Sequence, residues 1–190
     1  MALDRSLTTI PNLLTYGRIV AISVIVVLIV TGYPSLRWLA LVLYIAAAVS
    51  DFFDGYLARK WNQSSAFGRM LDHIADKLLV GALIVAFAWD RSLSSWDLIP
   101  ALAILLREIF VPGLREFLGP FNVVMKPTML AKWKTTVQML ALAFIFLAPL
   151  LAGAGFVAEL LLWLAGLMTI VTGAQYFQTA WPYLAGDGKP

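Results

Sequence analysis

The sequence predicts an all-α membrane protein, a polytopic bundle of six transmembrane helices. The 190 residues are 61% hydrophobic and only 13% charged, whereas an ordinary soluble domain has about 25% charged residues. Six apolar stretches have about the 20 residues that a helix needs to cross a bilayer. They run near residues 12–32, 36–59, 67–90, 96–118, 129–151 and 157–182. No linker or low-complexity segment divides them, so we expect a single domain over residues 1–190.

Each stretch has its own boundary signals. We expect the first to be a retained span, because its apolar run is longer than that of a signal peptide and no small-x-small cleavage site clearly follows. Pro11 after two threonines is typical of a helix start. The second stretch ends around Arg59 and Lys60, and the third begins near Gly68. The fourth stretch contains Arg107, and the later stretches follow a basic segment. Both features bear on the candidate site.

The distribution of lysine and arginine predicts the orientation, because cytoplasmic loops of membrane proteins are enriched in these residues. If the N-terminus is cytoplasmic, the outer loops contain only Arg37 and Arg91. We therefore expect both termini and the active site on the cytoplasmic side of the inner (cytoplasmic) membrane, with the bilayer and no nucleic acid as partner. The residues assigned to the cytoplasmic side are Arg5, Arg59, Lys60, Arg69, Arg115, Lys126, Lys132, Lys134 and Lys189.

Composition excludes several kinds of site. There is no cysteine, so the chain has no disulfide, zinc–thiolate site or thiol nucleophile. The one histidine, His73, excludes a site with several histidine ligands.

Four aspartates form the most informative pattern: Asp51 and Asp54 near the end of the second stretch, and Asp72 and Asp76 near the start of the third. Asp51 is eight residues before Arg59, roughly 12 Å from the interface at 1.5 Å per residue. Spacings of three and four keep each pair on one helical face. On consecutive antiparallel helices the two pairs fall at matching depth, so the four carboxylates are expected to converge just below the cytoplasmic surface.

Four ionised carboxylates at membrane depth repel one another and require positive charge. Oxygen ligands select hard cations such as Mg²⁺, Mn²⁺ or Ca²⁺, and four carboxylates suit two ions. Gly55 and Gly68 allow close approach of a ligand to the backbone, and Arg59 offers a planar donor for phosphate. The competing interpretation is that the aspartates pair with Arg59, Arg69 and Lys77 for structural reasons alone.

The aspartates and their neighbours, Asp51-x₂-Asp54-Gly55-x₂-Ala58-Arg59-x₈-Gly68-x₃-Asp72-x₃-Asp76, resemble the signature of the CDP-alcohol phosphotransferase family. The segment Pro11-Asn12-Leu13-Leu14-Thr15 with Arg18 is similar to the opening of these enzymes. The resemblance implies a six-helix membrane bundle, usually a homodimer. It also implies that Asp51, Asp54, Asp72 and Asp76 bind Mg²⁺ or Mn²⁺, that Asp76 is the catalytic base, and that Gly55, Ala58, Arg59 and Gly68 shape the pocket for the CDP group.

Two later segments of the sequence resemble one group of members within this family. Residues 106–117 and 131–139 are similar to members that use a phosphorylated acceptor. The implied reaction joins CDP-diacylglycerol and sn-glycerol 3-phosphate to give phosphatidylglycerophosphate and CMP. An acceptor phosphate needs a basic pocket, because arginine gives bidentate contacts and lysine a point charge. The expected acceptor-binding residues are Arg107, Arg115, Lys132 and Lys134, whereas Lys126 is interpreted as a topology signal.

Three alternatives stay open. Another family member would use serine, inositol phosphate or phosphatidylglycerol as the acceptor. A membrane prenyltransferase also binds a diphosphate through aspartates, but its aspartate spacing differs. A cation transporter would use the aspartates as its ion site, although transporters usually have a midplane site with broken helices or inverted repeats.

Overall fold

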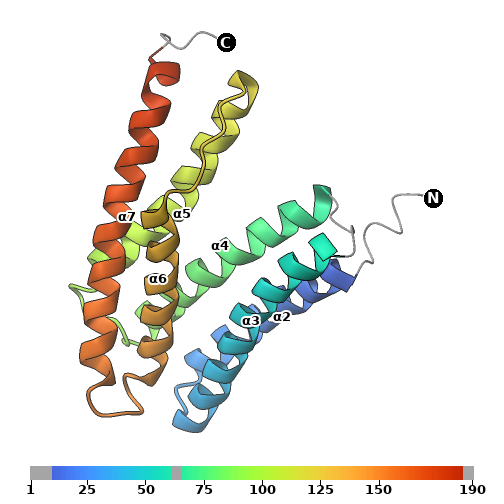
Figure 1. Cartoon of the computed structure of the whole chain (residues 1–190). Helices are drawn as coiled ribbons and strands as arrows, with labels where there is room; N and C mark the ends of the chain where they lie inside the picture. Colours follow the sequence, from blue (N-terminus) through green and yellow to red (C-terminus); the bar gives the residue numbers. More distant parts are fainter. Residues whose placement is uncertain (1–9, 61–65, 186–190) are drawn as a thin grey trace. The chain divides into compact units, whose positions relative to one another are not determined.

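The computed structural model describes residues 10–60 and 66–185, without the side chains of residues 10, 11, 51–60, 66 and 69. Within these ranges the chain is all-α, which confirms that part of the predicted fold class (Figure 1). The helices lie at the six predicted stretches, with ends that differ by a few residues. They are α2 (Ile10–Val30), α3 (Pro34–Lys60), α4 (Ala66–Trp89), α5 (Leu98–Leu118), α6 (Met129–Leu147) and α7 (Ala154–Leu184), with a short 3₁₀ helix η1 (Gly119–Phe121) after α5.

Among the described residues, three helices have both the length and the apolar composition needed to cross a membrane. They are Asn12–Val30 of α2, Met129–Leu147 of α6 and Ala154–Leu184 of α7. The apolar part of α3, Pro34–Ser50, is shorter because the aspartate segment follows it. The helices α4 and α5 are 24 and 21 residues long, but charged residues interrupt them. These features define an integral membrane protein, with three of the six predicted spans meeting both criteria.

The chain forms two compact units, Met1–Ser92 and Leu93–Pro190. In the first unit, α2 packs against both α3 and α4. Its buried face repeats every three or four residues, as an α-helix requires. Ile22, Ile25 and Ile29 form the apolar part of this face, and Asn12, Thr15 and Arg18 form its polar part.

Arg37 closes one end of the first unit by joining the first turn of α3 to the segment after α4. Its guanidinium forms an ion pair with Asp90, donates a hydrogen bond to Ser92 Oγ at 2.5 Å and lies 5.7 Å from the Phe87 ring centroid. The side chains of Arg37 and Asp90 are each 9% exposed. A buried arginine is stable only with such partners, so this contact fixes the end of α4 that is remote from Asp72 and Asp76.

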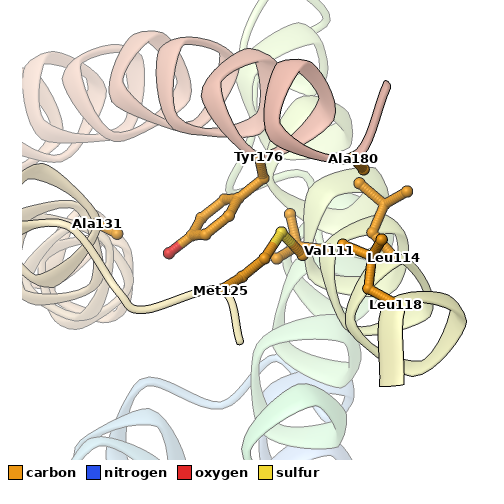
Figure 2. Packing of buried hydrophobic residues seen from close by; sticks show 7 residues of the cluster. All are labelled: Val111, Leu114, Leu118, Met125, Ala131, Tyr176 and Ala180. Atoms are coloured by element: carbon orange, nitrogen blue, oxygen red, sulfur yellow. The ribbon is translucent and has the colours of Figure 1, made fainter. Parts of the chain in front are cut away.

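In the second unit, α7 packs against α5 and α6. Gly166 of α7 lies close against α5, since an added Cβ would lie 2.6 Å from Pro100 Cβ. Further along α7, Tyr176 extends beside Met125 into a buried apolar cluster (Figure 2). The α5 side of this cluster contains Val111, Leu114 and Leu118. These contacts hold α5 and α7 together next to the charged residues described below.

Candidate active site

Two of the four predicted metal ligands lie together on α4. Asp72 and Asp76 are one turn apart, and their side chains are 40% and 45% exposed. Arg18 Nη1 on α2 donates a hydrogen bond to Asp72 Oδ1 at 3.2 Å and to Asp76 Oδ1 at 3.4 Å. The two carboxylates therefore converge on one positive group, as the spacing of four predicted.

Arg18 was not among the predicted site residues. Its side chain is only 1% exposed and lies on the buried polar face of α2 with Asn12 and Thr15. A sequence signal existed, because an arginine inside an apolar span needs a partner and usually marks a functional site. The spacing of three between Asn12, Thr15 and Arg18 indicates that all three share one face.

The other predicted donor-site residues lie mostly outside the described side chains. The backbone of α3 includes Asp51, Asp54, Gly55, Ala58 and Arg59, but their side chains are not described. Gly68 is in the first turn of α4 and is half-buried. Within the part of the chain whose side chains are described, no group of three potential metal ligands occurs. The four-aspartate site therefore stays a prediction, of which the structure shows the α4 half.

A second charged group lies in the unit formed by α5, α6 and α7. Glu108 Oε1 on α5 accepts hydrogen bonds from Lys134 on α6 and from Arg107 Nη1, the latter at 3.3 Å. Lys134 was predicted near a cytoplasmic loop, but its side chain is 0% exposed. Glu108 thus contacts both its neighbour Arg107 on α5 and the buried lysine of α6.

Tyr176 on α7 links the two predicted arginines of α5. Arg115 Nη2 donates a hydrogen bond to the Tyr176 hydroxyl at 3.4 Å. The guanidinium carbons of Arg115 and Arg107 lie 5.4 and 5.8 Å from the Tyr176 ring centroid, within the range of cation–π contacts. Sequence reasoning missed Tyr176, because nothing in its neighbourhood on α7 distinguishes it from a packing residue.

The predicted acceptor residues thus fall into two groups. Arg107, Arg115 and Lys134 belong to one cluster around Glu108 and Tyr176, whereas Lys132 is exposed in the first turn of α6. Three positive side chains and one carboxylate leave the cluster two positive charges. Among the described residues, the buried Nε atoms of Arg107 and Arg115 have no hydrogen-bond partner. The cluster has both charge and donors to offer an anion.

The buried pair between Glu108 and Lys134 leads to a stability prediction. Glu108→Gln is expected to lower the free energy of unfolding by roughly 3–5 kcal/mol, because it leaves the Lys134 ammonium buried without its carboxylate. The measurement is unfolding of the purified protein in detergent. Glu116→Gln, an exposed change on the same helix, is the control. Adding Lys134→Met to Glu108→Gln should recover part of the loss. A Glu108→Gln protein as stable as the wild type would contradict the prediction.

Comparison with known proteins gives the class to which this fold and these residues belong. The sequence model of CDP-alcohol phosphatidyltransferases matches residues 8–171, which include the whole aspartate signature and the charged residues of both groups, but not Tyr176. The chain belongs to the CDP-alcohol phosphatidyltransferase family. Its members are transferases of phospholipid biosynthesis and are generally metal-dependent.

Curated relatives show which activity within this family is found in proteins similar to this chain. The chain is 40% identical to the CDP-diacylglycerol–glycerol-3-phosphate 3-phosphatidyltransferase of Cereibacter sphaeroides, over 94% of this chain and 98% of the relative. Proteins of the same name are 44% identical in Rickettsia bellii, over 96% and 99% of the two chains, and 35% identical in Pseudomonas fluorescens, over 95% and 94%. The chain is thus similar over nearly its full length to enzymes of one named activity.

Proposed function

We propose that this chain transfers the phosphatidyl group of CDP-diacylglycerol to sn-glycerol 3-phosphate, giving phosphatidylglycerophosphate and CMP. The observation that carries the choice of acceptor is the cluster around Glu108, which has a surplus of two positive charges. A phosphomonoester carries about 1.5 to 2 negative charges at neutral pH, so it matches this surplus. The full-length similarity to enzymes named for this activity supports the same reaction.

The donor site is assigned to the aspartates of α3 and α4. Asp51, Asp54, Asp72 and Asp76 would hold two divalent ions, Mg²⁺ or Mn²⁺. The donor set fits such ions because it consists of carboxylate oxygens, and because Asp72 and Asp76 already converge on one positive group. When bound, the ions would supply positive charge to the diphosphate of the donor. Gly55, Ala58, Arg59 and Gly68 would shape the pocket for the CDP group.

Asp76 is assigned the role of general base. The oxygen of the acceptor 1-hydroxyl forms a bond to the phosphorus on the lipid side of the diphosphate, and the bond from that phosphorus to the oxygen of CMP breaks. The hydroxyl proton passes to the Asp76 carboxylate. The half-exposed Asp76 side chain supports this role, because a base must reach the substrate to take its proton.

The acceptor phosphate is assigned to Arg107 and Arg115. Each guanidinium is held on one side by the Tyr176 ring and still has donors for a phosphate oxygen. Lys132 is assigned a contact as well, since it is exposed at the start of α6. Lys134 is assigned an indirect role, because its ammonium pairs with Glu108 and adds positive charge to the cluster.

This assignment predicts how arginine variants respond to each substrate. Arg107→Ala and Arg115→Ala are each expected to raise the KM for glycerol 3-phosphate by about 10–150-fold, or to abolish turnover, because a hydrogen bond to a charged group is worth roughly 1.5–3 kcal/mol. Affinity for CDP-diacylglycerol should change little. Arg→Lys should rescue only partly, because lysine lacks the planar fork. Separate titration of the two substrates measures both effects.

Lys126→Ala is the matched control, since Lys126 is an exposed cation in the segment before α6 that has no assigned contact with substrate. Its KM for glycerol 3-phosphate should equal that of the wild type. Weakened binding of CDP-diacylglycerol with unchanged acceptor kinetics in the arginine variants would place Arg107 and Arg115 at the donor site instead.

Release of CMP distinguishes a transferase from a cation transporter with the same aspartates. The purified protein should release CMP from CDP-diacylglycerol only when an acceptor is present, and a transporter would release none.

The proposal also includes the assembly and topology of the protein. We propose a homodimer whose active site and both termini lie on the cytoplasmic side of the inner membrane. The match of the family to residues 8–171 supports one functional domain.

A further inference from the structure

We infer that Arg18 is a built-in counter-cation of the metal site: it holds Asp72 and Asp76 when metal is absent and competes with metal for them. This inference rests on the metal site proposed above. It makes Arg18 a positioning residue that acts through the two carboxylates.

The contacts of Arg18 show where its charge acts. Nη1 reaches both carboxylates, at 3.2 Å from Asp72 Oδ1 and 3.4 Å from Asp76 Oδ1. The Arg18 side chain is 1% exposed, whereas the aspartates are 40% and 45% exposed. The guanidinium therefore approaches the carboxylates from the protein side, and the other side of the carboxylates is exposed. An ion arriving from solvent would meet carboxylates that are already shared with a cation.

The location of Arg18 indicates that this residue serves the aspartate site and is not a signal for membrane orientation. Arg18 is inside an apolar span, where a charged side chain is costly unless it has a partner. Asn12 and Thr15 continue the same buried polar face of α2. A lysine or arginine retained for orientation would instead lie in a loop or at a helix end.

Electrostatics determine whether loss of Arg18 raises or lowers the affinity of the site for metal. At the distance of a hydrogen-bonded ion pair, a guanidinium attracts a carboxylate and repels a divalent ion bound to the same carboxylate. Removing the guanidinium therefore strengthens metal binding and weakens the metal-free protein, in which Asp72 and Asp76 would lose the contact with Arg18 and repel each other more strongly. An arginine that served only to pack helices would change stability without this dependence on metal.

The test measures Mn²⁺ affinity and thermal stability in the purified full-length protein. Arg18→Gln is expected to bind Mn²⁺ at least about tenfold more tightly than the wild type, since one neighbouring positive charge is lost. It should also have a lower Tm than the wild type in EDTA, with a smaller difference in saturating Mn²⁺. Arg37→Gln is the matched control, because it breaks a second arginine–aspartate contact of the same unit, at the far end of α4. It should lower Tm equally with and without Mn²⁺ and leave the affinity unchanged.

Unchanged or weaker Mn²⁺ binding by Arg18→Gln would overturn the inference, as would an equal loss of Tm in EDTA and in Mn²⁺. If Arg18→Gln does not fold, Arg18→Met carries the test, because methionine also removes the charge and its flexible apolar side chain is tolerated inside an apolar span. It should bind Mn²⁺ more tightly than the wild type, and unchanged or weaker binding would again overturn the inference. Absence of Mn²⁺ binding by the wild type would refute the proposed metal site itself, which is a distinguishable result.

Discussion

Asp76→Asn is expected to lower kcat by about 10²–10⁴-fold, the usual contribution of a general base. The amide has nearly the same shape as the carboxylate but does not accept the proton of the acceptor hydroxyl. Binding of CDP-diacylglycerol should weaken less than in Asp51→Asn or Asp54→Asn, because those residues are assigned to the metals alone. The measurement is turnover of each purified variant with saturating substrates, together with donor affinity.

The control for this variant is Glu159→Gln, the same change of carboxylate to amide at an exposed position of α7. Its turnover should equal that of the wild type. If Asp76→Asn kept more than about a tenth of wild-type turnover, the assignment of Asp76 as base would be wrong.

Removal of divalent ions is expected to abolish turnover. Four aspartates carry four negative charges, and Arg18 contacts two of them with a single positive charge. Without metal, these carboxylates would repel the negatively charged diphosphate of the donor. Dialysis against EDTA should stop CMP release, and added Mg²⁺ or Mn²⁺ should restore it.

The control for metal removal is a wild-type sample dialysed without EDTA, whose activity should persist. The Tm of both samples shows whether the protein stays folded during the treatment. Full activity in metal-free buffer would contradict the assignment of the four aspartates to metal ions.

The helices were predictable because their signal is local. An apolar run of about 20 residues and its boundary residues are visible in one segment of the chain, so all six helices were placed within a few residues. The convergence of Asp72 and Asp76 was predictable for the same reason, since a spacing of four sets two residues on one face. The boundary between the two compact units near Ser92 has no comparable sequence signal.

The partners of the charged residues were not predictable, because they depend on contacts between distant segments. Arg18 is 54 residues from Asp72, and nearer cations such as Arg69 and Lys77 were equally reasonable partners from the sequence. Lys134 was expected near a loop, yet Glu108, 26 residues earlier, makes its burial possible. A buried charge requires a partner, but the sequence does not say which helix supplies it.

The choice of acceptor is the central claim, and a panel of acceptors tests it most directly. The purified protein is supplied with CDP-diacylglycerol, Mg²⁺ and one acceptor at a time: glycerol 3-phosphate, serine, inositol phosphate or phosphatidylglycerol. Lipid products are identified by mass spectrometry, and CMP is quantified in the same samples. We expect phosphatidylglycerophosphate and an equal amount of CMP with glycerol 3-phosphate and no lipid product with the other three. A lipid product formed from serine, inositol phosphate or phosphatidylglycerol, with none from glycerol 3-phosphate, would contradict the account.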